Sequence, residues 1–379
     1  MKQKAYVGRG SISFCGPILK TLGAKKIFLV TGKKSYSVSG AKDKLSNLPE
    51  NLEITIFKDF ENVAKLNDVM SGIELFNKTG YDAVIAVGGG SVINIAKMVN
   101  FFGTNKLDPE EYLKNRKREN FSKKPLIAIP TTAGSGSEAT HFAVVYDGKK
   151  KYSVSDESIL PEYALVDADL TMSMPPRVAA VTGMDALAQA IESYWGVNST
   201  DLSREYAREA ISLIIENIVR AVEDPSPASE EALARAAHLS GKAINITKTS
   251  APHAVSYPLT AHFNIPHGHA VALTLPGFFV YNFGVEGRDL TDPRGVDFVK
   301  ARIVELVGLL GSNSVEAARD NLGRIIRKVG LETRLSRITR EPYQNVEDVI
   351  IEGIDTDRMN NNPRRVTISA VREILKNIF

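Results

Sequence analysis

Cysteine is almost absent from this sequence: Cys15 is the only one among 379 residues. A single cysteine cannot form a disulfide within the chain, which excludes a disulfide-stabilised scaffold and suits a reducing compartment. Long apolar runs are also missing, and the first residues, MKQKAYVGRGSISF, lack the apolar segment of a signal peptide. We therefore expect a cytoplasmic protein with no membrane partner.

A large excess of charge of either sign is absent as well. The 47 basic and 44 acidic residues leave a formal net charge of +3, too small to favour nucleic acid through the overall field. The chain does have an ordinary globular composition, with 43% hydrophobic residues. Its length is sufficient for two domains with separate cores.

The first part of the chain, up to about residue 170, alternates β-rich runs with helical or loop segments. The runs that we expect to form strands are KKIFLVTG (25–32), LEITIFKDF (52–60), YDAVIAVGGG (81–90), PLIAIPTT (125–132), HFAVVYD (141–147) and YALVDADL (163–170). Several are continuous Val, Ile and Leu runs, as in strands that helices cover on both faces. The alternation predicts a Rossmann-like, doubly wound, mostly parallel sheet.

The pattern changes after MSMPPR, which spans 172–177. Helical spacing of apolar residues then dominates, in segments 202–222, 229–244, 298–310 and 314–330. We therefore expect an α/β domain over residues 1–174 and an α-helical domain over residues 175–379.

The segment AVIAVGGGSVINIAK contains a buried strand, three glycines, a serine and the start of a helix. Glycines allow close approach of a ligand, and the first N–H groups of the helix favour an anion, so the turn suits a pyrophosphate. The alternative is a tight turn that needs glycine only for its backbone angles. The loop PTTAGSGSEAT (130–140) has similar character and follows another strand. The residues predicted to bind a dinucleotide are Gly89, Gly90, Ser91, Thr131, Thr132 and Ser135.

The end of the first expected strand bears on the choice of cofactor. Gly32 and Lys33 are followed by Lys34 and Ser35, with no acid to bind a ribose 2′-hydroxyl. This favours NADP(H) over NAD(H), although exposed lysines are also common in solvated turns. The stretch VGRGSISFCG starts like a dinucleotide fingerprint, but Ser13 stands at the third glycine position and no strong strand precedes it, so we predict a surface turn there.

A second group of polar residues lies in the helical half. In GMDALAQAIESYW, Asp185 and Gln189 are one helical turn apart, and His253 and Tyr257 share the same spacing. His267 follows a proline where a loop leads into a helix. Two imidazoles and a carboxylate are enough to hold a divalent metal, with the Gln189 oxygen as a weak fourth ligand. Spacing alone leaves open that these histidines only satisfy hydrogen bonds at helix crossings, as we expect of His238 and His262.

Several motifs together resemble the iron-containing alcohol dehydrogenase family, which shares its fold with dehydroquinate synthase. They are GGGS with its helix, PTTAGSGSE, VDADLT, GMDALAQAIE, HAVSYPL followed by PHG, and NNPRRVTISAVREIL. The resemblance implies a dehydroquinate synthase-like fold, a homodimer, a nicotinamide cofactor that Lys151 helps to bind, and a metal held by Asp185, His253 and His267. Three positions depart from the family pattern: Gln189 and Tyr257, often histidines, and Asn94, usually an aspartate beside the cofactor. The metal, iron or zinc, is then expected to be held more weakly.

The departures, with EATHFAVVYDGKKKYSV (138–154), resemble a subgroup that reduces phosphonoacetaldehyde to 2-hydroxyethylphosphonate. We therefore expect NAD(P)H-dependent reduction of a small aldehyde, with Tyr257 or His269 in the proton relay. A phosphonate needs donors, and the candidates are His141, Lys151 and Arg365. The alternatives are a generic short-chain alcohol dehydrogenase of the same family, a lyase that uses NAD without net redox change, and a nucleotide-binding protein that has lost catalysis.

Overall fold

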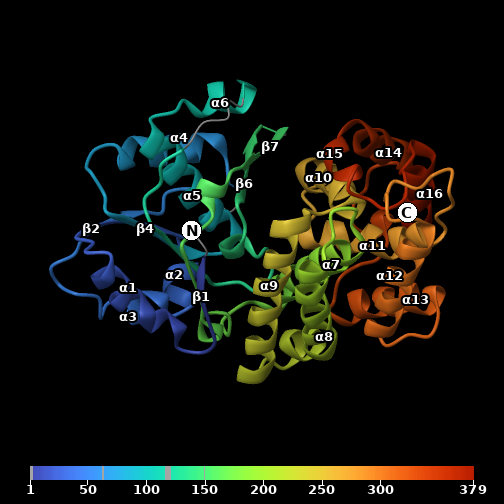
Figure 1. The fold of residues 1–379 in the computed structure, drawn as a ribbon, viewed down its shortest axis with the longest axis horizontal. Helices are drawn as coiled ribbons and strands as arrows, with labels where there is room; N and C mark the ends of the chain where they lie inside the picture. The colour runs from blue at the N-terminus through green and yellow to red at the C-terminus, as the bar shows by residue number, and fades with distance from the viewer. Residues whose placement is uncertain (1–2, 62–63, 116–120, 149) are drawn as a thin grey trace. The chain divides into compact units, whose positions relative to one another are not determined.

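The computed structural model describes residues 3–61, 64–115, 121–148 and 150–379. The chain divides into two compact units, Met1–Met174 and Pro175–Phe379, coloured blue to green and green to red in Figure 1. Among the described residues no helix is both long and apolar enough to cross a membrane.

The first unit is built on a six-stranded parallel sheet with the order β1-β8-β5-β4-β2-β3. Its strands are β1 (Lys4–Val7), β2 (Lys26–Thr31), β3 (Glu53–Phe57), β4 (Ala83–Gly88), β5 (Leu126–Pro130) and β8 (Tyr163–Val166). Five of these were expected from the apolar runs. The predicted doubly wound sheet is confirmed.

Alternating residues of the central strands enter two separate cores. In β2, Phe28 and Val30 pack with α4 (Leu66–Phe76) and α5 (Gly90–Asn105), whereas Ile27 and Leu29 pack with α1 (Cys15–Thr21) and α3 (Ala41–Leu45). Figure 1 shows these helix pairs on opposite sides of the sheet. Because both faces are covered, the strands must be apolar at every position, which explains the continuous runs in the sequence.

The strand order reverses between β2 and β4. The chain leaves β2 for β3 on one side and returns to β4 on the other side. In open α/β sheets, ligands bind outside the carboxyl ends of the strands at such a switch point. Gly32 follows β2 and Gly89 follows β4, so the two glycine turns of the sequence analysis lie at this edge.

The run at 141–147 forms a strand outside the main sheet, so its expected place there was wrong. It is β6 (Phe142–Asp147), which pairs antiparallel with β7 (Lys150–Ser155) in a separate two-stranded sheet. The burial of β6 alternates, unlike that of the central strands. This alternation is typical of a hairpin with only one covered face.

The predicted surface turn at VGRGSISFCG is confirmed only for residues 8–10, of which Arg9 is exposed. The edge strand β1 precedes it, and the chain continues through the 3-10 helix η1 (Ser11–Phe14) into α1. The buried acid of VDADLT, Asp167, accepts hydrogen bonds from the backbone N–H groups of Gly10 (2.9 Å) and Ile12 (3.2 Å). The short, largely exposed β1 gave no apolar run for the sequence analysis to detect.

The second unit is helical throughout its named elements. These are α7 (Pro176–Trp195), α8 (Asp201–Glu223), α9 (Pro227–Thr247), α10 (Ala251–Phe263), α11 (His267–Phe283), α12 (Val296–Leu309), α13 (Val315–Lys328), η5 (Leu335–Arg337), α14 (Tyr343–Glu352), α15 (Thr356–Met359) and α16 (Ile368–Ile378). Helix α7 packs against α8, α9 and α11, so its residues from Gly183 to Trp195 are all buried. Any polar side chain on that part of α7 must therefore find a partner inside the unit.

Candidate metal and cofactor sites

One face of helix α7 carries a stripe of buried polar side chains. Asp185, Gln189 and Glu192 follow the spacing i, i+4, i+7, and all three side chains are buried. Residues at this spacing share one face of a helix. Buried carboxylates are costly unless they are paired or bind a metal, so this stripe marks a site.

Two other helices bring imidazoles to Asp185. His253 lies on α10 and His267 is the first residue of α11, and one ligand atom from each of Asp185, His253 and His267 lies within 4.8 Å of the others. The Asp185 Oδ1 atom is 3.3 Å from Nε2 of His253 and 4.0 Å from Nε2 of His267. We call these three residues the triad.

Gly268 explains how α11 comes so close to α7. A Cβ atom at this position would lie 2.0 Å from the main-chain oxygen of Val181 and 2.9 Å from the Cβ of Asp185. Any other residue would push the start of α11, and with it His267, away from Asp185. The glycine of the PHG motif is thus required by packing.

The chemistry of the triad fits a divalent metal. Oδ1 of Asp185 is buried and has no hydrogen-bond partner among the described residues. Burial raises the pKa of Asp185, but the neighbouring imidazoles outweigh this and hold it below its ordinary value. Burial likewise opposes charge on His253, yet Glu192 and Asp185 raise its pKa to about 9. One carboxylate and two imidazoles suit iron(II) or zinc and leave positions open.

Glu192 was not assigned a role from the sequence. Its side chain is fully buried, one oxygen contacts Nδ1 of His253, and the other accepts the backbone N–H of Ser250 at 2.8 Å. The signal that could have identified it was its place on the stripe of Asp185 and Gln189. A pair of residues one turn apart, such as Asp185 and Gln189, does not extend to the next turn, where Glu192 lies.

Gln189 lies beside Asp185, but its amide is turned differently from the prediction. The carbonyl oxygen, expected as a weak fourth ligand, accepts a hydrogen bond from the Ser240 hydroxyl at 3.2 Å. The amide N–H group donates to the Asp185 carboxylate, which lowers the pKa of that acid. In this arrangement Gln189 orients a ligand of the triad.

Tyr257 belongs to the same site and His269 does not join it. The Tyr257 ring stacks on His267 with centroids 5.7 Å apart, and burial raises its pKa to about 12. His269 is two residues beyond His267 on α11, which turns it to another face of the helix. Its Nε2 donates to the main-chain oxygen of Glu332 at 2.6 Å, so its expected part in a proton relay has no support in this geometry.

The other two histidines of this unit differ from each other. His238 is buried on α9, as expected for a residue at a helix crossing. His262 is exposed near the end of α10, and its predicted hydrogen bonding at a helix crossing stays a prediction.

In the first unit, the glycine turn and the PTTAGSGSE loop are packed together. A Cβ atom on Gly90 would lie 2.6 Å from Oγ of Ser135, and one on Gly89 would lie 3.4 Å from Oγ1 of Thr132. No side chain caps the start of α5, and the buried Oγ1 of Thr131 has no hydrogen bond among the described residues. Helix N–H groups without a side-chain acceptor fit a diphosphate.

The remaining predicted residues are distributed as follows. Ser91 and Asn94 are half-buried on α5, while Gly32 is half-buried and Lys33 exposed after β2. Nδ1 of His141 lies 3.6 Å from a carboxylate oxygen of Glu157, and Lys151 is half-buried on β7. Arg365 is exposed, and its backbone N–H donates to the main-chain oxygen of Asp289 at 2.7 Å.

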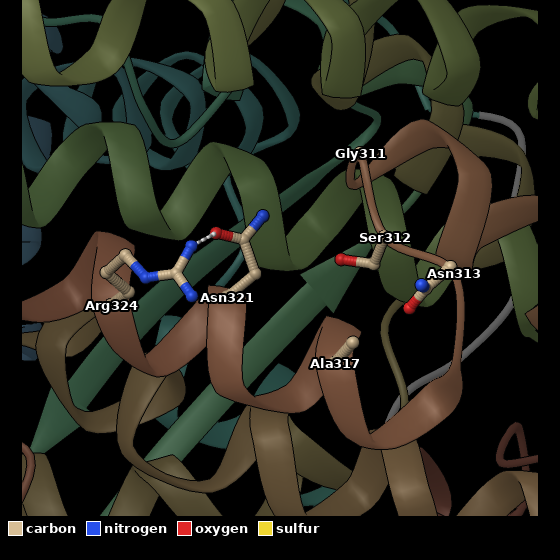
Figure 2. A pocket seen from close by; sticks show the side chains of 6 residues that line it. All are labelled: Gly311, Ser312, Asn313, Ala317, Asn321 and Arg324. Atoms are coloured by element: carbon tan, nitrogen blue, oxygen red, sulfur yellow. Dashed lines mark hydrogen bonds between the residues drawn. The ribbon is translucent and has the colours of Figure 1, made fainter.

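A surface hollow of about 400 Å³ opens elsewhere in the second unit, at the turn between α12 and α13. Figure 2 shows its lining, in which Arg324 donates to the side-chain oxygen of Asn321 at 3.1 Å. The hollow contains none of the triad residues, and its lining offers no carboxylate or imidazole. We therefore do not associate it with the chemistry of the metal site.

Comparison with known proteins agrees with this geometry. The family model described as iron-containing alcohol dehydrogenase matches residues 2–168, and the model of the family's C-terminal part matches residues 179–379. The chain belongs to the iron-containing alcohol dehydrogenase family. It is an oxidoreductase that interconverts alcohols and aldehydes with a nicotinamide cofactor.

Individual relatives show how varied the family is. The phosphonoacetaldehyde reductase of Streptomyces viridochromogenes is 32% identical over 78% of this chain and 75% of its own length. The aldehyde-alcohol dehydrogenase 2 of Entamoeba histolytica is 35% identical over 76% of this chain, which corresponds to only 35% of that longer protein. Among solved structures, the sulfoacetaldehyde reductase of Bifidobacterium kashiwanohense with NAD+ has a TM-score of 0.85 at 27% identity, covering 99% of this chain and 96% of its own.

Proposed function

We propose that this enzyme uses NADPH to reduce a two-carbon aldehyde that carries a tetrahedral anionic group, with phosphonoacetaldehyde as the best candidate. The observation that carries the aldehyde chemistry is the triad, in which Asp185 presents to two imidazoles an oxygen that has no hydrogen-bond partner among the described residues. Asp185, His253 and His267 would hold a divalent metal there. When bound, the metal polarises the aldehyde oxygen and the nicotinamide supplies the hydride.

Tyr257 is the proposed proton donor group beside the triad. Its pKa of about 12 keeps the phenol protonated at neutral pH, and its ring is held against His267 by stacking. A protonated phenol at this place would donate a hydrogen bond to the aldehyde oxygen as negative charge develops there. It would then give its proton to the alkoxide, which forms the alcohol, and water would return a proton to the phenolate. Gln189 contributes by orienting Asp185.

The anionic group is proposed on two grounds. Two relatives act, by their names, on two-carbon aldehydes with a phosphonate or a sulfonate. In addition, Arg358 is half-buried on α15, and this helix packs against α10, which carries Tyr257. Burial raises the pKa of Tyr257, and the positive charge of Arg358 lowers it. A guanidinium near Tyr257 is suited to bind a tetrahedral anion. The candidates from the sequence, His141, Lys151 and Arg365, remain further proposals.

The substrate proposal is tested by steady-state rates with NADPH and phosphonoacetaldehyde, butyraldehyde or lactaldehyde. We expect phosphonoacetaldehyde to have the highest kcat/KM. The change Arg358→Gln should lower that value by about 100-fold, since loss of one partner of a charge pair costs several kcal/mol. The same variant should reduce butyraldehyde about as well as wild type. If the kcat/KM of wild type were ten times higher for butyraldehyde than for phosphonoacetaldehyde, the proposal of an anionic substrate would be refuted. The result would instead favour a generic short-chain alcohol dehydrogenase.

The preference for NADPH is proposed from the end of β2. Gly32, at the end of this strand, carries no acidic side chain to repel a 2′-phosphate, and Lys33 is exposed beside it. Two acids follow β3: Asp59, which is exposed, and Glu61, which is engaged by Lys65 at 2.6 Å.

We predict that Gly32→Asp reduces kcat/KM with NADPH by about 100-fold, because the new carboxylate faces a phosphate dianion. The ratio of rates with NADPH and NADH measures the effect, and NADH should be affected much less. The Ser35 hydroxyl, 2.2 Å from a Cβ at position 32, must rotate to make room. Gly80→Asp, at a glycine with open space around it, adds the same charge as a control. An unchanged ratio in Gly32→Asp would place the 2′-phosphate elsewhere.

A further inference from the structure

Glu192 is a fully buried carboxylate whose two oxygens meet only hydrogen-bond donors. We propose that Glu192 is a positioning residue: it fixes the tautomer and orientation of the His253 ring, so that Nε2 is available to the metal. This inference rests on the proposed metal site.

The hydrogen bonds of Glu192 determine which nitrogen of the His253 ring carries the proton. Oε1 receives the N–H of Ser250 at 2.8 Å, its hydroxyl at 3.1 Å, and the N–H of His253 at 3.4 Å, while Oε2 contacts Nδ1 of the His253 ring. A carboxylate only accepts hydrogen bonds, so Nδ1 must carry the proton. In the neutral ring that binds a metal, the lone pair is therefore on Nε2, the atom 3.3 Å from Oδ1 of Asp185.

The carboxylate itself is held in place from both sides. Ser250 precedes α10, and its hydroxyl accepts a hydrogen bond from the indole N–H of Trp195, the last residue of α7. Since that hydroxyl accepts from Trp195, its own proton is directed to Glu192. The start of α10, and therefore His253 in its first turn, is tied to the same side chain that orients the imidazole. Such partners of metal-bound histidines raise ligand basicity and fix ring orientation.

The isosteric change Glu192→Gln separates this role from simple packing. An amide has one accepting end and one donating end. The donors of Ser250 and His253 would hold the carbonyl oxygen, which leaves the NH2 group facing Nδ1. The ring must then accept at Nδ1 and carry its proton on Nε2, where it opposes metal binding. Shape and volume are almost unchanged.

The first experiment measures zinc affinity by competition with a chromophoric chelator. We expect Glu192→Gln to bind zinc about 10–100-fold more weakly than wild type, the range seen when partners of this kind are removed. The control is Glu230→Gln, the same change at a buried carboxylate on α9, which should leave zinc affinity unchanged. Equal affinity in a folded Glu192→Gln protein would overturn the proposal. Failure of wild type to bind zinc would instead refute the metal site itself.

The second experiment needs no substitution. In zinc-loaded protein labelled with 15N-histidine, only six imidazoles contribute signals, and His253→Asn identifies the one of interest. We expect His253 to show a proton on Nδ1 and zinc on Nε2. A zinc-loaded wild type in which Nδ1 of His253 carries no proton would overturn the positioning role, whether or not the Glu192→Gln protein folds.

Discussion

Asp185→Asn is expected to lower kcat/KM for aldehyde reduction by about 1,000-fold, because polarisation by a metal is worth several kcal/mol and each factor of ten needs about 1.4 kcal/mol. The change keeps the shape of the side chain and removes the charge that binds the metal. Oδ1 of Asp185 is buried and has no hydrogen-bond partner among the described residues, so it is the oxygen that we expect to bind the metal. Rates and bound metal are measured on the same preparation.

Asp297→Asn provides the matched control, since it makes the same change at an exposed position on α12. It should leave both rate and metal content unchanged. A metal-free Asp185→Asn protein with nearly full activity would contradict the Lewis-acid role, and the hydrogen bonds of Gln189 and Tyr257 would then have to stabilise the oxyanion. A wild type that binds NADPH but reduces no short aldehyde would point to the catalytically degenerate alternative.

The parallel sheet could be predicted because its central strands are apolar at every position. Two helical cores leave no face of β2 or β4 open to solvent, and this requirement appears directly in the sequence. The edge strand β1 lacks that requirement and was missed. The β6 run was recognised as a strand, but its antiparallel partner β7 is only partly buried and rich in lysine and serine, so the hairpin left a weak signal.

The triad was predictable for a different reason. Its residue types are those that bind metals, and the family resemblance selected them from among the other histidines. The roles of Glu192 and Gln189 depend on which way a carboxylate and an amide face across α7, α9 and α10. Spacing along one helix indicates which side chains share a face, but it does not identify the residues of neighbouring helices that contact this face. Those assignments therefore required three-dimensional contacts.

Gly90→Ala is expected to weaken NADPH binding by about 100-fold, the scale expected when a binding group is misplaced by about 1 Å. The new Cβ would lie 2.6 Å from Oγ and 2.9 Å from Cβ of Ser135. Rotation of the hydroxyl cannot relieve the second contact, so the loop that carries Thr131 and Thr132 must move away from the start of α5. Titration of NADPH fluorescence gives the dissociation constant directly, independent of turnover.

The double variant Gly90→Ala/Ser135→Gly tests the cause of that loss, because it removes the two atoms that lie nearest to the new methyl group and leaves only Oγ of Ser137, at 3.3 Å. We expect the double variant to recover most of the affinity for NADPH. If Gly90→Ala acted by making the helix less flexible or by impairing folding, the second substitution would not restore binding. Gly308→Ala, at a helical glycine with open space around it, should bind NADPH like wild type. If Gly90→Ala alone binds NADPH as tightly as wild type, the diphosphate does not lie against this turn. The N–H groups at the start of α5 would then have no part in holding the cofactor.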